Sequence, residues 1–153
     1  MHGVHIDLIG RIFGQLTQLQ RRDRTGVLDH FQAAANLTFR VTDAAGHAWA
    51  LRRPPLGHLL PTAHDMAREH RIVAALAGTA VPVAPLVGLC EDTSVNDAPF
   101  YVMEKVDGVI YRDARSLATL SAEDATRVSH ALVDVLVDIH AVDYEAVGLG
   151  DFG

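Results

Sequence analysis

The stretch from Asn36 to Arg53, NLTFRVTDAAGHAWALRR, is the most informative part of this chain for its fold. Apolar and polar residues alternate over residues 37–42, and the same alternation returns over residues 47–52. Successive side chains of a strand point to opposite faces of a sheet, so each half predicts a strand with one apolar side. Asp43 to Gly46, between the two halves, has the composition of a turn. The stretch therefore predicts a β-hairpin.

The residues after the hairpin predict one helix and two more strands. Pro54 to Gly57 ends the second hairpin strand, and Gly78 ends the helix that follows. The helix is expected to run from about Ala63 to Ala77, with Ile72, Val73 and Leu76 on its inward face. The predicted strands are Leu86–Cys90 and Phe100–Glu104, and Val106–Gly108 is a linker.

Two further helices are expected towards the ends of the chain. Residues 6–20 carry apolar side chains at three- and four-residue spacing, which predicts an amphipathic helix. Ser121 begins a capping pattern, and a helix should run from there to about His140. Its apolar stripe is expected to pack into a core, and consists of Val128, Leu132, Val135, Leu136 and Ile139.

Composition favours a soluble, folded, cytoplasmic protein. The chain has 153 residues, of which 49% are hydrophobic and 21% charged, with one cysteine and a net charge of −6. Residues 1–75 carry nine arginines against six acids, and residues 76–153 carry four basic residues against thirteen acids. The arginines are dispersed and lack interleaved aromatics, so we expect no nucleic-acid binding. No apolar run approaches the roughly 20 residues that a membrane span needs.

Local strings across the predicted sheet and helix resemble a known family. They are LRRPP (51–55), LLP (59–61), AHDM (63–66), EHR (69–71) and FYVME (100–104). The chain is similar, over about residues 36–150, to the aminoglycoside phosphotransferase family, in the branch associated with acyl-CoA dehydrogenases. This resemblance implies an α+β fold: a protein-kinase-like N-terminal lobe with an antiparallel sheet and one helix, then a hinge and the first helix of the C-terminal lobe.

The resemblance also implies three segments and a nucleotide site. Residues 1–30 would be a helical segment outside the match, 31–105 the nucleotide-binding lobe, and 106–153 the hinge and the start of a truncated C-terminal lobe. Ala50 would pack against adenine, and Arg52 would hold the α- and β-phosphates of ATP in place of the usual lysine. Arg53 would point away.

Three further residues complete this implied site. Glu69 would pair with Arg52 and fix its side chain, with Asp65 as the alternative acid. Backbone groups of Glu104 and Val106 would contact the adenine edge. Magnesium is expected in the full family fold, but this chain offers no ligands for it.

The sequence departs from the family pattern in two places. The turn before the first hairpin strand, His30 to Asn36, contains no glycine although the family has a glycine-rich turn there. Asp151-Phe152-Gly153 resembles a magnesium-binding kinase motif, but its partner motif is missing near His140, so we assign it no catalytic role. No catalytic base can be assigned either, and we expect the isolated chain to be inactive.

Three functions therefore stay open. The first is an ATP-dependent phosphotransferase acting on a small hydroxylated substrate, by analogy of an acyl-CoA type, once a C-terminal lobe is present. The second is a pseudokinase-like module that binds a nucleotide or a partner, with self-association through an uncovered apolar face after Gly108. The third is a gene remnant. Nine scattered histidines predict no metal set, and Cys90 is more consistent with a structural thiol than with a nucleophile paired to His140.

Overall fold

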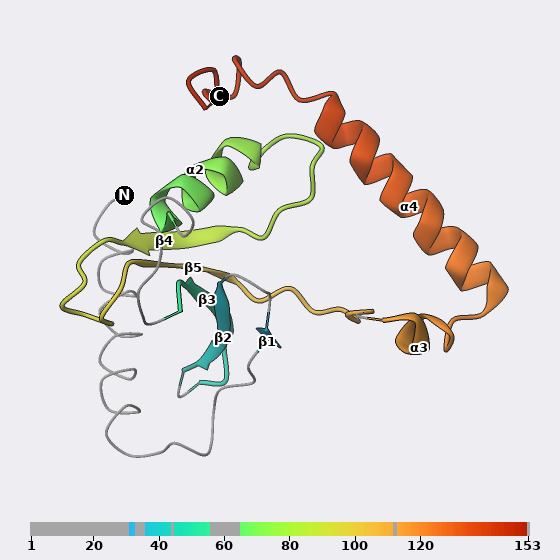
Figure 1. Cartoon of the computed structure of the whole chain (residues 1–153), viewed down its shortest axis with the longest axis horizontal. Helices are drawn as coiled ribbons and strands as arrows, with labels where there is room; N and C mark the ends of the chain where they lie inside the picture. The colour runs from blue at the N-terminus through green and yellow to red at the C-terminus, as the bar shows by residue number, and fades with distance from the viewer. Residues whose placement is uncertain (1–30, 33–35, 44, 56–64, 112, 153) are drawn as a thin grey trace. The chain divides into compact units, whose positions relative to one another are not determined.

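The computed structural model describes residues 31–32, 36–43, 45–55, 65–111 and 113–152 (Figure 1). The chain divides into two compact units. The first contains the β-sheet and most of helix α2, and it ends at Lys105. The second contains residues 75–83 and everything from Val106 onward, including helices α3 and α4. The helix expected over residues 6–20 lies outside the described residues.

The first unit is built on a five-stranded antiparallel sheet. Its strands are β1 (Phe31–Gln32), β2 (Leu37–Thr42), β3 (Ala48–Arg53), β4 (Leu86–Cys90) and β5 (Phe100–Glu104), in the order β1-β2-β3-β5-β4. The predicted hairpin is β2 and β3, and the two later strands have the predicted bounds. The pairing of β3 with β5 joins residues about 50 apart in the chain, for example Leu51 with Val102.

The hairpin turn is stabilised by the side chain of Asp43. Its Oδ1 accepts hydrogen bonds from the backbone N–H groups of Ala45, at 2.9 Å, and His47, at 2.8 Å. Gly46 closes the turn at φ +88°, a conformation that residues with a Cβ rarely adopt. The turn chemistry expected from Asp43 and Gly46 is therefore present.

The hydrophobic core lies on one face of the sheet, as the alternation predicts. Trp49 and Leu51 point to this face from β3, whereas Ala50 and Arg52 belong to the other face. The buried cluster consists of Val41, Trp49, Leu51, Val87, Phe100 and Val102. Each of these side chains contributes roughly 1.5–3 kcal/mol when it is fully buried. The side chain of Cys90 is partly buried and packs against the cluster.

Helix α2 spans Met66–Leu76. Asp65 precedes it and accepts a hydrogen bond from the backbone N–H of Arg68 at 2.8 Å, which satisfies one of the free donors of the first turn. Met66 is buried, and the residues expected on the inward face, Ile72, Val73 and Leu76, are half-buried. Gly78, at φ +94°, follows the helix where the predicted end lies.

The second unit contains the short helix α3 (Ala114–Leu117) and the longer helix α4 (Ala122–His140). Ser121 caps α4 as predicted, because its Oγ accepts the backbone N–H of Asp124 at 3.0 Å. The expected core packing of the α4 stripe was wrong for this chain: Leu132 is 71% exposed and Leu136 49%. An apolar stripe on a helix is buried only where another element covers it, and the sequence of the helix does not identify that element. No helix in the described part of the chain is long and apolar enough to cross a bilayer.

Candidate functional site

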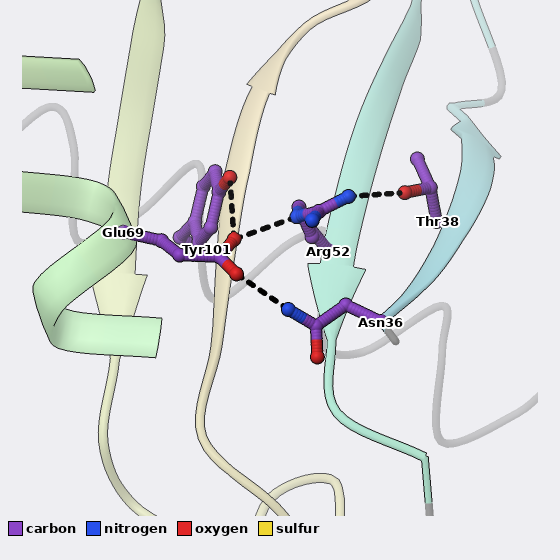
Figure 2. A network of polar contacts seen from close by, with 5 residues as sticks. All are labelled: Asn36, Thr38, Arg52, Glu69 and Tyr101. Carbon is purple, nitrogen blue, oxygen red and sulfur yellow. Dashed lines mark hydrogen bonds and ion pairs between the residues drawn. The ribbon is translucent and has the colours of Figure 1, made fainter. Parts of the chain in front are cut away.

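An ion pair joins the sheet to helix α2. Arg52 projects from β3 on the face opposite the core, and its Nε donates to Oε2 of Glu69 at 2.7 Å (Figure 2). The two side chains are 25% and 31% exposed, so the pair is partly accessible to solvent. The structure thus brings together Arg52 and Glu69, the cation and acid that the resemblance pairs. Asp65, the alternative acid, instead caps α2.

Three residues that the sequence patterns did not indicate complete this network. Asn36 donates from Nδ2 to Oε1 of Glu69 at 2.5 Å, and the Tyr101 hydroxyl donates to Oε2 at 3.4 Å (Figure 2). Thr38 accepts a long contact of 3.4 Å from Nη1 of Arg52. The strand register explains the grouping, because Thr38 and Tyr101 lie directly beside Arg52 on β2 and β5. The alternation of side chains along each strand could have placed Thr38, Arg52 and Tyr101 on one face. Only the register between the strands makes them neighbours.

Burial and charge act on this network in opposite directions. Burial alone lowers the pKa of Arg52, but the hydrogen bond and negative charge of Glu69 outweigh it, and the net pKa is raised. Burial raises the pKa of Tyr101 to about 12; Arg52 opposes this effect and Glu69 adds to it. Arg52 therefore stays a cation, and Tyr101 stays a neutral donor, throughout the physiological range.

The raised pKa of Tyr101 predicts a loss of stability in alkali. The folded-state pKa of about 12 exceeds the ordinary value of 10.0, so stability is fully present below pH 10 and falls as the pH rises towards 12. The slope should approach 1.4 kcal/mol per pH unit, roughly 2.3RT for one proton. Tyr101→Phe should flatten this decline. Urea unfolding followed by the fluorescence of Trp49, the single tryptophan, measures it between pH 8 and 11.5. An equally steep decline in the variant would contradict the assignment.

Arg53 points away from the network, as expected. It is only 6% exposed, and its Nη1 donates to Oδ1 of Asn96 at 2.9 Å in the loop between β4 and β5. Its Nη2 is buried and has no hydrogen-bond partner among the described residues. Burial lowers the pKa of Arg53, an effect that the nearby charge of Asp97 partly opposes. Arg53 therefore belongs to the packing of the opposite face.

The other predicted site residues lie at different places. Ala50 is half-buried on the Arg52 face and pairs with Met103 of β5. Glu104 ends β5, and its backbone N–H donates to the carbonyl of Pro85 at 2.8 Å, so an adenine contact from Glu104 would have to use its carbonyl. Val106 belongs to the second unit and is 71% exposed. In the described residues no three His, Cys, Asp or Glu side chains gather as metal ligands would.

Comparison with known proteins identifies the family of this chain. The profile of the phosphotransferase enzyme family matches residues 31–153. The chain belongs to the phosphotransferase enzyme family. The chain also resembles, with a TM-score of 0.64 and 33% identity, the crystal structure of a "putative aminoglycoside phosphotransferase" from Ralstonia eutropha JMP134. This confirms the predicted kinase-like α+β fold.

Curated relatives confirm the predicted branch of the family. The chain is 42% identical over 125 residues to acyl-CoA dehydrogenase family member 10 of Mus musculus, and 33% identical over 133 residues to family member 11 of Homo sapiens. These matches cover 82% and 86% of this chain but only 11% and 17% of the relatives. The match to the Ralstonia structure covers 90% of this chain and 40% of that one.

Proposed function

We propose that this chain is the nucleotide-binding part of an ATP-dependent phosphotransferase that transfers the γ-phosphate to a hydroxyl of a small molecule. The observation that carries the proposal is the orientation of Arg52. Glu69 engages its Nε, whereas its Nη side makes only the 3.4 Å contact with Thr38 within the described residues. A guanidinium held in this way presents donors in a plane, as recognition of phosphate oxygens requires.

The remaining parts of this proposal follow the family resemblance. Residues 31–105 would form the nucleotide lobe, and residues 106–153 the hinge and the start of the second lobe, with Val106 and the carbonyl of Glu104 on the adenine edge. Ala50 would lie against the adenine ring. Magnesium and a catalytic base are needed for the transfer, and we assign neither to a residue of this chain. The proposed setting is the cytoplasm, and the proposed substrate is a hydroxylated compound of an acyl-CoA type.

Arg52→Ala should weaken ATP binding by about 10- to 100-fold, because charge-assisted hydrogen bonds contribute about 1.5–3 kcal/mol. Calorimetric titration of the 153-residue chain with MgATP measures this effect. Arg71→Ala, which removes an exposed arginine from α2, is the matched control and should bind as the wild type does. Equal affinity of the Arg52 variant and the control would refute the phosphate contact.

We also expect no phosphorylation of added alcohols by this chain alone, and turnover would contradict that expectation.

The exposed stripe of α4 favours a second candidate function, a module that associates through this helix. Three large apolar side chains of this stripe are about half exposed or more: Leu132 at 71%, Leu136 at 49% and Ile139 at 47%. Exposed apolar patches of this kind mark association surfaces. We therefore propose self-association of the isolated chain through α4.

Leu132→Ser should shift the chain towards monomer in sedimentation velocity at micromolar concentrations. The physical reason is the loss of about 2 kcal/mol of apolar burial in each copy of an associated pair. Val109→Ser removes an apolar side chain that is 75% exposed outside α4, and serves as the control. A wild-type chain that stays monomeric, or a control with the same effect as Leu132→Ser, would rule out the α4 surface.

A further inference from the structure

Two buried side chains, Asn36 and Tyr101, donate hydrogen bonds to the carboxylate of Glu69. Arg52 and Glu69 are a quarter to a third exposed, but Asn36 is 2% exposed and Tyr101 is 3% exposed. Asn36 occupies Oε1 of Glu69, and Tyr101 donates to Oε2, the oxygen that also accepts Nε of Arg52 (Figure 2). Each oxygen of the carboxylate therefore has a defined donor.

The two oxygens of the Glu69 carboxylate have different donors, and this limits how Glu69 can bind Arg52. A carboxylate and a guanidinium commonly form two parallel hydrogen bonds, which would engage an Nη donor as well as Nε. The amide of Asn36 competes for Oε1 and favours the single contact through Nε. A partly exposed ion pair without such support loses much of its energy to side-chain entropy, since both side chains are long.

We propose that Asn36 and Tyr101 are positioning residues: they hold Glu69 so that it engages Arg52 through Nε alone. Among the described residues this leaves Nη2 of Arg52, and Nη1 apart from its long contact with Thr38, for an anion. The identity of that anion as a nucleotide phosphate rests on the proposed function, but the orientation of Arg52 does not. The strand register supports the assignment of Tyr101, because Arg52 and Tyr101 are direct partners across β3 and β5. Asn36 lies one residue before β2 and two before Thr38, which places it near the same face.

Asn36→Asp tests the role of Asn36 because it keeps the shape of the side chain and replaces a donor with a carboxylate. At neutral pH the two carboxylates should repel, and Glu69 should turn away from Arg52. The direct reporter is the Nε–H signal of Arg52 in a nitrogen–proton NMR spectrum, assigned by its loss in Arg52→Lys. We expect this signal to shift and to lose its protection from exchange in the variant, and to recover at low pH, when a shared proton rejoins the two acids.

The same variant should bind ATP about tenfold more weakly than wild type at neutral pH, as expected for one lost charge-assisted contact, and should regain affinity as the pH falls. His70 on α2 lies against Tyr101, with ring centroids 6.0 Å apart, and burial lowers its pKa. The wild type is therefore measured over the same pH series as the baseline. Asn96→Asp introduces the same change next to Arg53 on the opposite face, and should leave the Arg52 signal unchanged.

Tyr101→Phe provides a second variant if Asn36→Asp does not fold. It removes only the 3.4 Å hydrogen bond, so we expect a smaller shift of the Arg52 signal in the same direction. An Arg52 signal that matches the wild type in the variants at every pH would overturn the proposal. If the signal responds as expected while wild-type ATP binding is absent, the positioning role stands and the proposed nucleotide function fails.

Discussion

Phe100→Ala should lower the free energy of unfolding of the first unit by about 3–5 kcal/mol, the range for large-to-small aromatic substitutions in cores. Phe100 is 1% exposed and belongs to the buried cluster that also contains Trp49 and Leu51. Its removal deletes buried apolar area and leaves a cavity that a paired sheet cannot close fully, because the strand register holds the backbone apart.

Urea unfolding followed by Trp49 fluorescence reports on this cluster directly, because Trp49 is one of its members. Tyr144→Ala is the matched control, since Tyr144 is 59% exposed in the second unit, and should change stability by less than about 0.5 kcal/mol. A loss below about 1 kcal/mol in Phe100→Ala would mean that the face of the sheet opposite Arg52 is not a packed core.

Glu69→Ala should lower the free energy of unfolding by about 2 kcal/mol, within the range of about 1–3 kcal/mol for partners left unsatisfied. The substitution removes the acceptor of Arg52, Asn36 and Tyr101 at once. The amide of Asn36 and the hydroxyl of Tyr101 are too deeply buried to recover these hydrogen bonds with water easily. This exceeds the 0–1 kcal/mol expected of an ordinary surface ion pair.

A double-mutant cycle separates the ion pair from the rest of the network. We expect Arg52→Ala and Glu69→Ala to be non-additive by about 1 kcal/mol, because each variant already removes their contact. Glu91→Ala, an exposed acid after β4, controls for a general change in charge. If Glu69→Ala and Glu91→Ala had the same effect, Glu69 would be an ordinary surface acid.

Only part of the candidate site could be predicted from the sequence. The ion pair between Arg52 and Glu69 was expected from the resemblance, and its two residues lie on separate elements with 16 residues between them. Asn36 and Tyr101 were not expected, because a lone asparagine before a strand and a tyrosine in an apolar strand carry no local sign of a shared partner. The roles of Arg52 and Glu69 in a nucleotide site remain predictions, like those of Ala50, Glu104 and Val106.

For helix α4, the sequence predicted the helix itself but not its environment. Its existence and its start at Ser121 follow from local sequence, because the cap and the helical periodicity act over a few residues. Its environment does not follow, since an apolar stripe predicts that something covers the helix but not whether the covering element belongs to the same chain. The 71% exposure of Leu132 could be known only from the structure.

Local sequence patterns predicted four of the five strands, β2 to β5, together with helix α2, the cap of α4, the apolar face of the sheet and the family, whereas β1 lies where a turn was expected. These features depend on alternation, turn residues and strings that act within short stretches of chain. Tertiary structure alone decided that β3 lies between β2 and β5, that Glu69 rather than Asp65 engages Arg52, and that Asn36 and Tyr101 hold Glu69. Those outcomes depend on which distant residues come within hydrogen-bonding reach, and the register between strands, a non-local property, sets that distance.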